Sequence, residues 1–344
     1  MGMVINGQWS DEDQILKDGA YVRQQSRFDQ PLTSEQITTI KNNPGRFHLL
    51  ASYSCPWSHR AMIMRLLNGL ESLIPLTMIG GKRVQGYPIA NGDSWTIPGT
   101  TKEIVHLHEL YTLSDEQYTG RSTVPVLWDS ETKKIICNES VALMRALGDL
   151  SFAPDSDTVD WTPATLLADI DSWNDDIYQH FSNGVYRAGF SDSQEARHQA
   201  VIDIETLLQK TEAHLATNRY LSGDVLTEAD WRFFPTLIRF DTCYYSLFKC
   251  SSRPLTGWPT LFAYTRELYN ISRIRQSVNF DVMYQACFDN DVHDHEDLPK
   301  TRPEISWSLP HNRDFVGTGN VMLKDGTTRQ VEEWLNSLTE NERK

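Results

Sequence analysis

The sequence predicts an α/β domain followed by an all-helical domain, and three observations lead to that prediction. A chain of 344 residues is too long for one ordinary domain and suits two. Predicted strands and helices alternate between residues 46 and 150, whereas the pattern after residue 160 is helical throughout. The segment 151–160 between them is acidic, contains proline and shows no periodicity, which is typical of a linker.

The α/β domain begins with a strand, a helix and a second strand. Residues 47–53 form a short apolar run of strand length, and 57–69 have a helical pattern that ends at a glycine. Residues 73–79 are again strand-like. Strand, helix and strand in this order form a βαβ unit, for which we expect a right-handed crossover.

A β-hairpin and a helix complete this domain. The apolar runs 124–128 and 135–137 flank a polar turn and predict the hairpin. Asn138-Glu139-Ser140 then opens a helix, with an acidic residue where the helix dipole favours one. A βαβ unit followed by ββα is the order of the thioredoxin fold, so we expect a thioredoxin-like domain over residues 46–150.

The remaining segments are an arm, a helical domain and a tail. Residues 1–45 are polar and aperiodic, and we interpret them as an extended arm. The helical domain is expected over 161–298, with one helix from about Ser193 and another from Thr227, which starts a Thr-x-x-acid signal. The tail over 299–344 contains three prolines and ends in a short predicted helix.

Composition argues against several classes of protein. Hydrophobic residues make up 40% of the chain and charged residues 23%, as in an average soluble protein, and no apolar run is long enough to cross a bilayer. The formal net charge of −14 repels phosphate backbones and anionic lipid surfaces. We therefore expect neither a nucleic acid nor a membrane as partner.

The cysteines and the acidic clusters also limit the chemistry. Five widely spaced cysteines without a CxxC pair argue against a disulfide framework and a zinc site, and they fit a reducing cytoplasm. The acidic and histidine-containing stretch 289–297 lacks the glycine of a calcium loop and any zinc-ligand spacing. We expect it to be a solvated acidic loop, and we expect no metal cofactor.

Cys55 is the candidate catalytic residue. It follows the first predicted strand and precedes Pro56, at a helix start where unpaired backbone N–H groups and the helix dipole stabilise a thiolate. Proline suits the first helical turn, where no N–H is needed. Because Ser58 stands three positions on, no CxxC disulfide can form, and a sulfur partner would come from outside. The alternative is a buried structural cysteine.

Two further signals suggest what this thiol would act with. Val124-Pro125 precedes the third strand, where thioredoxin-like domains carry a cis proline; an ordinary edge-strand proline is the alternative. Glu139-Ser140 offers a carboxylate for an ammonium group, and a hydroxyl with N–H groups for a carboxylate. These would match the two charged ends of a γ-glutamyl group, as in glutathione, although the pair is also an ordinary helix cap.

Several motifs, taken together, resemble one family. In chain order they are INGQW at 5–9, CPWSHR at 55–60, VPVLWD at 124–129, NES at 138–140, NGVYRAGF at 183–190, TEAD at 227–230 and RFD at 239–241. This set is similar to the glutathionyl-hydroquinone reductases, the Xi-class glutathione transferases, from residue 5 to about residue 281. CPW-x-HR followed by NGVY-x-AGF is specific, whereas neither motif alone would be.

The resemblance implies both an architecture and an activity. A thioredoxin-like domain would pack on an all-helical, glutathione-transferase-like domain with the active cleft between them, and the protein would form a homodimer. The enzyme would remove glutathione from glutathionyl-hydroquinone conjugates. Cys55 would attack the glutathione sulfur, and a second glutathione would resolve the mixed disulfide.

The resemblance also assigns residues to roles. Tyr186 would supply the proton that the departing hydroquinone carbon needs, and Tyr244 would line the pocket and help to stabilise the thiolate. Without the motif around it, Tyr186 would be interpreted as a core tyrosine. The glutathione-binding residues would be Tyr87, Arg121, Ser122, Thr123, Val124, Glu139 and Ser140.

Two departures from the family pattern concern the pocket. The family's glutathione-contacting tryptophan, in a Gly-Trp pair, falls on Gly86-Tyr87, with Trp95 as a weaker candidate. The family's His-Tyr-Tyr corresponds to Ala286-Cys287-Phe288, so a tyrosine hydroxyl is missing. The alternative functions are therefore a transferase or lyase acting on a different electrophile, and a non-catalytic binding protein that kept the fold.

Overall fold

The structure is a computed structural model that describes all residues except 1, 13–15, 90–91, 293–297 and 342–344. The chain divides into two compact units. One contains Met1–Leu150 and Ser277–Leu298, and the other Ser151–Gln276 and Pro299–Lys344. None of the described helices combines the length and the apolar character needed to span a bilayer.

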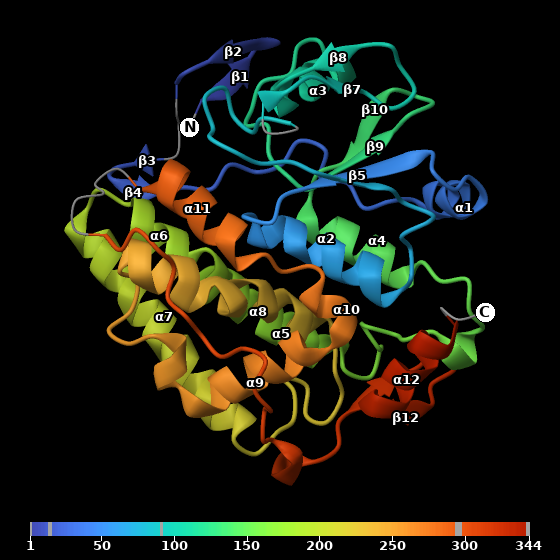
Figure 1. Ribbon diagram of the computed structural model, residues 1–344, viewed down its shortest axis with the longest axis vertical. Coiled ribbons are helices and arrows are strands. Elements are labelled where there is room, and N and C mark those ends of the chain that lie inside the picture. The colour runs from blue at the N-terminus through green and yellow to red at the C-terminus, as the bar shows by residue number, and fades with distance from the viewer. Residues whose placement is uncertain (1, 13–15, 90–91, 293–297, 342–344) are drawn as a thin grey trace. The chain divides into compact units, whose positions relative to one another are not determined.

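The first unit is built on a four-stranded mixed sheet (Figure 1). Its main elements are β5 (Phe47–Ala51), α2 (Pro56–Leu67), β6 (Leu76–Met78), α3 (Leu107–Ser114), β9 (Val126–Asp129), β10 (Lys134–Cys137) and α4 (Ser140–Asp149). The strand order is β10-β9-β5-β6, with β5 parallel to β6 and antiparallel to β9. The predicted βαβ unit and β-hairpin, and with them the thioredoxin-like fold, are confirmed.

Burial explains why these segments take these forms. Leu49, Leu50 and Ala51 of β5 are fully buried, and every residue of α2, which packs against β5 and α4, is buried. Helix α3 was not predicted, although its start carries a signal. The Glu109 carboxylate accepts the backbone N–H of His106 at 3.0 Å, which satisfies a donor at the helix N-terminus.

The arm is more ordered than the sequence analysis predicted. It contains β1 (Met3–Ile5), β2 (Gln8–Ser10), β3 (Leu16–Lys17), β4 (Ala20–Tyr21) and α1 (Ser34–Asn42). Asn6 and Gly7 both have positive φ, at 49° and 78°, which is the geometry of the Asn-Gly hairpin turn between β1 and β2. A capping box between Thr33 and Gln36 starts α1. The arm is therefore not irregular as predicted, because the Asn-Gly turn and the Thr33 capping box each order a short segment locally.

The segment 277–298 also departs from the predicted division, which placed it in the helical domain. Its helix α11 (Phe280–Asp291) belongs to the first unit. The Ser277 hydroxyl lies 2.6 Å from Nε2 of the buried His59, and Asp291 forms an ion pair with Arg83. These polar contacts attach the segment 277–298 to the thioredoxin-like unit.

The second unit is helical, as predicted. It contains α5 (Leu167–Asp176), α6 (Gly184–Phe190), α7 (Gln194–Leu215), α8 (Glu228–Arg239), α9 (Pro259–Asn270) and α10 (Ser272–Arg275), with π-helical segments at Ile177–Ser182 and Phe240–Phe248. The Ser193 hydroxyl accepts the N–H of Ala196 at 3.3 Å, and a capping box joins Thr227 to Asp230. Both predicted helix starts are therefore confirmed.

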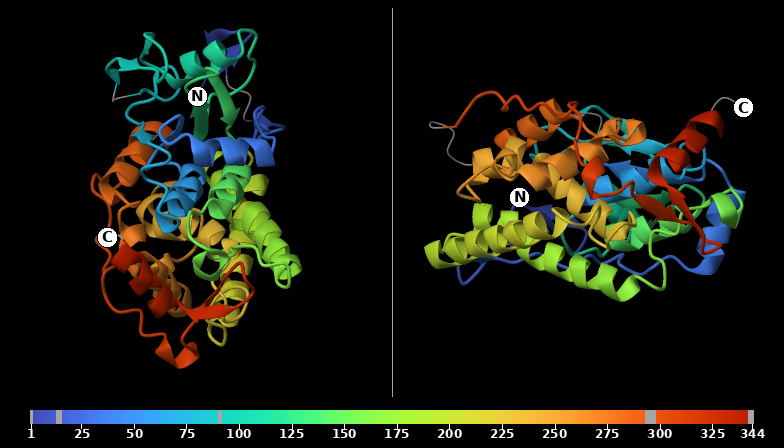
Figure 2. Two further views of the ribbon diagram at one scale, coloured as in Figure 1. Left: turned by 90° about the vertical axis from the view of Figure 1, so that its right-hand side faces the viewer. Right: turned by 90° about the horizontal axis from the view of Figure 1, so that it is seen from below.

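The tail folds back on the beginning of this unit (Figure 2). It forms the strand pair β11 (Asn320–Met322) and β12 (Thr328–Gln330), followed by the predicted C-terminal helix α12 (Val331–Asn341). The N–H of Asp160 donates to the Met322 carbonyl at 2.8 Å, and Trp161 packs edge-on against Trp334 at 5.6 Å. The predicted linker is thus held by the tail.

Candidate active site

Cys55 lies at the junction of β5 and α2, where the sequence placed it. It is the N-cap of α2, with extended backbone angles, and Pro56 is the first helical residue. The backbone N–H of Ser58 donates to its Sγ at 3.4 Å, and the thiol donates to the Val124 carbonyl at 3.5 Å. An N–H of the first helical turn therefore points at the sulfur, which stabilises negative charge there.

The Val124–Pro125 peptide bond is cis, as predicted. The carbonyl of Val124 faces Cys55, so the segment before β9 runs directly beside the thiol. Val124 and Cys55 are both buried, at 3% and 7% exposure. The structure therefore brings together two of the predicted site residues that are 69 positions apart in the chain.

Two backbone carbonyls in the segment before Val124 accept hydrogen bonds, whereas one buried side-chain hydroxyl in it has no partner among the described residues. The Tyr118 hydroxyl donates to the Arg121 carbonyl at 2.8 Å, and the Tyr111 hydroxyl donates to the Thr123 carbonyl at 2.6 Å. The Ser122 hydroxyl is buried without a hydrogen-bond partner in the described part of the chain. A buried polar group without a partner is costly, so this hydroxyl is suited to meet a ligand.

Glu139 and Ser140 stand at the start of α4. One carboxylate oxygen of Glu139 accepts the N–H groups of Val141 and Ala142 at 2.7 and 2.8 Å, so Glu139 caps the helix. Its other oxygen lies 3.4 Å from the Ser140 hydroxyl, which also accepts from Arg60 at 3.4 Å. The capping alternative raised by the sequence is therefore realised: one Glu139 carboxylate oxygen caps the helix and the other accepts from the Ser140 hydroxyl.

Tyr87 lies in the loop after β6. Its carbonyl accepts the N–H of Leu107 at 2.9 Å, and its ring packs under the guanidinium of Arg83 at 4.6 Å. Burial raises the pKa of Tyr87 to about 12, and the charges that act on it include those of Arg83, Cys55 and Arg121. Tyr87 therefore shares the neighbourhood of the thiol.

The first unit contributes residues that the sequence analysis did not assign. The guanidinium groups of Arg23 and Arg60 lie 4.1 and 4.5 Å from the centre of the Trp57 ring. The Gln24 side chain accepts the N–H of Arg121 at 3.0 Å. Arg60 could have been found through the CPWSHR motif, whereas Arg23 and Gln24 lie in the arm and carry no local signal.

Tyr186 and Tyr244 are brought together in the second unit. Tyr186 is on α6 and Tyr244 on the π-helical segment Phe240–Phe248, and their hydroxyl oxygens are 3.3 Å apart. Their ring centres are 5.8 Å apart, and Phe190 and Phe248 extend the aromatic cluster. One hydroxyl can therefore donate to the other, which would stabilise a phenolate that forms on its partner.

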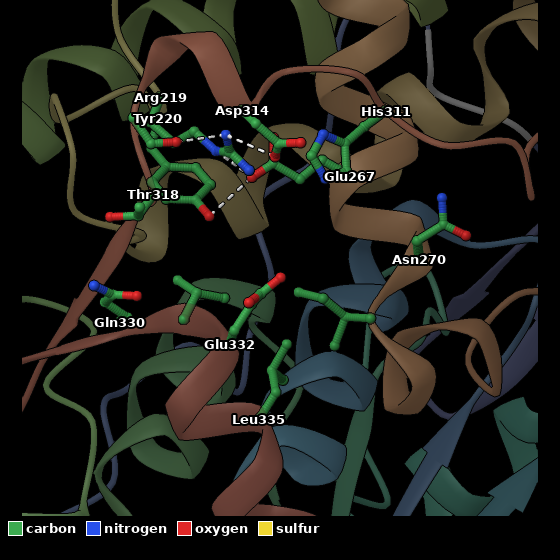
Figure 3. A pocket seen from close by; sticks show the side chains of 13 residues that line it. Arg219, Tyr220, Glu267, Asn270, His311, Asp314, Thr318, Gln330, Glu332 and Leu335 are labelled. Carbon is green, nitrogen blue, oxygen red and sulfur yellow. Dashed lines mark hydrogen bonds and ion pairs between the residues drawn. The ribbon is translucent and has the colours of Figure 1, made fainter.

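The second unit also contains a cavity of about 440 Å³ (Figure 3). Its upper wall holds the carboxylate of Glu267, which is bound by Arg219 and Arg313 at 2.7 Å each and by the Tyr220 hydroxyl at 3.0 Å. Glu332 of α12 points into it from the opposite wall. None of the predicted site residues lines this cavity.

The acidic stretch 289–297 is described only in part, because residues 293–297 lie outside the described residues. The expectation of a solvated loop is wrong for Asp291, whose side chain is 8% exposed and paired with Arg83 at 2.7 Å. Among the described residues, no group of histidine, cysteine, aspartate and glutamate has the arrangement of a metal site.

Comparison with known proteins places this geometry in a family. The family model described as glutathione S-transferase, N-terminal domain, matches residues 54–150, and the C-terminal domain model matches residues 194–267. Glutathionyl-hydroquinone reductase PcpF from Sphingobium chlorophenolicum is 37% identical over 282 residues, which cover 81% of this chain and 88% of that protein.

Solved structures agree in fold and in sequence. The Xi class transferase from Natrialba magadii superposes with a TM-score of 0.77 and 32% identity, covering 92% of this chain and 98% of that one. The glutathione-bound structure of YqjG from Escherichia coli K-12 superposes with a TM-score of 0.74 and 33% identity, covering 91% of this chain and 99% of that one. This chain belongs to the glutathionyl-hydroquinone reductases, the Xi class of the glutathione transferases.

Proposed function

We propose that this protein removes glutathione from glutathionyl-hydroquinones through a mixed disulfide at Cys55. The observation that carries the proposal is the position of Cys55 as N-cap of α2, with the Ser58 N–H directed at its sulfur. Two relatives carry the name glutathionyl-hydroquinone reductase, at 37% and 36% identity over most of this chain. Glutathione is the co-substrate.

The reaction has two steps. The Cys55 thiolate attacks the sulfur of the conjugate, so an S–S bond forms and the bond between sulfur and the hydroquinone carbon breaks. The electron pair of that bond goes to the carbon, which takes a proton from Tyr186 and leaves as free hydroquinone. A second glutathione thiolate then attacks the mixed disulfide, which releases oxidised glutathione and restores the Cys55 thiolate.

The proposed roles of the other residues follow from their surroundings. Tyr244 would donate its hydrogen bond to the Tyr186 oxygen as that oxygen loses its proton, which the 3.3 Å separation permits. Ser122, with its buried hydroxyl, and Ser140 would bind the γ-glutamyl carboxylate, and Glu139 would receive the ammonium group. Val124 would pair with the peptide backbone of glutathione, while Arg121, Thr123 and Tyr87 would complete the site.

Several broader features belong to the same proposal. The thioredoxin-like domain over 46–150 would bind glutathione, and the helical part of the second unit, up to Gln276, would supply residues that meet the substrate. We propose a homodimer in the cytoplasm, as expected for the family and for a chain with five free cysteines.

A second candidate is a transferase or lyase that acts on a different electrophile. It is favoured by the replacement of pocket tyrosines by Cys287 and Phe288, since Cys287 is buried and the Phe288 ring stacks on Tyr284. A non-catalytic binding protein is a third candidate. The capped thiol at Cys55 and the Tyr186–Tyr244 pair argue against it, because neither is needed for binding alone.

Mass spectrometry would test the proposal most directly. After exposure to oxidised glutathione, we expect a single glutathione adduct, located on Cys55 by peptide mapping and removed by reduced glutathione. With glutathionyl-menadiol and glutathione, we expect menadiol and oxidised glutathione in equal amounts. An adduct at another cysteine would move the chemistry away from Cys55, and an adduct without turnover would favour the second candidate.

A further inference from the structure

One departure from the family pattern, Tyr87, lies against Arg83 in the loop that follows β6. The Arg83 guanidinium packs on the ring of Tyr87, which stands in place of the family's tryptophan, with 4.6 Å between the guanidinium carbon and the ring centre. Arg83 therefore contacts one of the two replaced positions directly.

Helix α11 holds this loop through two side chains at its C-terminal end. Arg83 Nη1 lies 2.7 Å from Asp291 Oδ1, and the two side chains are only 9% and 8% exposed. The Arg83 backbone N–H donates to the Asn290 side chain at 2.6 Å, and the Asn290 amide donates to the Gly81 carbonyl at 3.3 Å. A buried pair with added backbone hydrogen bonds fixes geometry, because removing one partner leaves the other charge buried and unpaired.

The Tyr87 side chain is fixed at its base and on its ring, while its tip is available. Its carbonyl is bound by the Leu107 N–H at 2.9 Å, and its ring by Arg83. Its hydroxyl has no hydrogen-bond partner among the described residues. Because burial raises the pKa of Tyr87 to about 12, this hydroxyl stays protonated at neutral pH and can donate to a ligand.

We propose that Arg83 is a positioning residue, which acts with Asp291 and Asn290 to hold Tyr87 in place for glutathione. This inference rests on the proposed function, since it assumes that Tyr87 contacts glutathione near Cys55. It assigns a role to the end of α11, which the resemblance alone would not suggest. It also explains how a tyrosine can serve where the family uses a larger ring.

The first test separates substrate binding from chemistry. In Arg83→Met and Asp291→Asn, we expect the KM for glutathione to rise about tenfold, as for the loss of one buried contact, while kcat changes less than about twofold. The charge-swapped double variant, Arg83→Asp with Asp291→Arg, should recover part of the loss. Tyr87→Ala should raise the KM for glutathione to the same extent as Arg83→Met.

The matched control is Lys82→Met, which removes a positive charge from the neighbouring exposed residue and should leave KM unchanged. We call the contacts of Arg83 with Asp291, Asn290 and Tyr87 the Arg83 clamp. An equal rise in KM in Lys82→Met and Arg83→Met would show that positive charge in the loop matters rather than this clamp, and would overturn the proposal. Arg83→Lys keeps a cation beside Asp291 and serves as a second variant if Arg83→Met does not fold.

The second test does not depend on turnover. Hydrogen exchange of the backbone amides at 81–89 should become faster in Arg83→Met and Asp291→Asn, but not in Lys82→Met. Calorimetric binding of glutathione to each variant in a Cys55→Ser background should weaken about tenfold in the same two variants. If the natural protein binds glutathione without turnover, the proposed function fails and the clamp remains testable. If Arg83→Met folds and shows unchanged hydrogen exchange at 81–89 and unchanged affinity for glutathione, the proposed role of the Arg83 clamp is wrong.

Discussion

Two strand-to-helix junctions in the thioredoxin-like unit each carry a buried cysteine whose sulfur accepts a backbone N–H at 3.4 Å, and they differ in what accepts the N–H groups of the first helical turn. At the β5–α2 junction Cys55 is itself the helix N-cap, and the Ser58 N–H donates to its sulfur. At the β10–α4 junction Cys137 lies two residues before the cap, and Glu139 takes the N–H groups of the first turn. Burial raises the pKa of the Cys137 thiol to about 12, and the Glu139 charge adds to this effect.

This difference shows that a position just before a helix does not by itself make a cysteine a nucleophile. What matters is which side chain occupies the N-cap, because the free N–H groups of the first turn stabilise only the negative charge that they reach. At the first junction an N–H of this turn reaches a sulfur, and at the second two N–H groups reach a carboxylate. The carboxylate then disfavours a thiolate nearby.

The largest expected effect separates the two cysteines by activity. Cys55→Ser should lower the removal of glutathione by at least about 10³-fold, since the nucleophile is lost, while glutathione binding stays nearly intact. Cys137→Ser should keep turnover within about twofold. Turnover of glutathionyl-menadiol and calorimetric binding of glutathione would measure both. Activity retained in Cys55→Ser would place the catalytic thiol elsewhere.

Alkylation would sharpen the same comparison without substrate. Because the pKa of Cys137 is raised to about 12, on the order of one molecule in a thousand carries its thiolate at pH 9, and Cys137 should stay unmodified below that pH. Cys55 should react with iodoacetamide at pH 7 at least about tenfold faster than an exposed model thiol. Peptide mapping against pH would measure both rates. A Cys55 rate equal to that of the model thiol would show that the N-cap position does not activate it.

The replacement of family tyrosines by Cys287 and Phe288 tests whether the residues around the β5–α2 junction limit the reaction at Cys55. The loss of one buried hydrogen bond to substrate costs about 1–3 kcal/mol, or roughly ten- to a hundredfold in rate. We therefore expect weak turnover of glutathionyl-benzohydroquinone, better turnover of the larger glutathionyl-menadiol, and a gain in Cys287→Tyr or Phe288→Tyr. Robust turnover by the natural protein, unchanged in both variants, would show that this part of α11 does not line the pocket.

The smallest expected effect concerns the cap at the second junction. Glu139→Ala removes the acceptor of two N–H groups and should lower the free energy of unfolding by about 1 kcal/mol. Urea unfolding would measure it. Glu139→Asp, which keeps a good N-cap, should restore most of the stability. A loss of glutathione affinity without a loss of stability would instead indicate that Glu139 serves the ligand and not the helix.

Much of the fold could be predicted because the signals were local. The apolar runs around β5 and β9, the Cys55-Pro56 helix start and the capping signals at Ser193 and Thr227 each lie within a few residues of what they determine. The arm hairpin and α1 had such signals as well and were missed. The structure places Cys55 beside Val124 and Tyr186 beside Tyr244, and the roles of these residues stay predictions.

The sequence by itself determined the thioredoxin-like order of elements and pointed to Cys55 as the candidate nucleophile, since both follow from short patterns of burial and helix capping. Only the tertiary structure decided which partners those residues have. The pairing of Arg83 with Asp291 joins residues 208 positions apart, and the packing of Arg23 on Trp57 depends on the course of the arm. No local pattern encodes such contacts, because they arise where separate segments bury their charges and rings against one another.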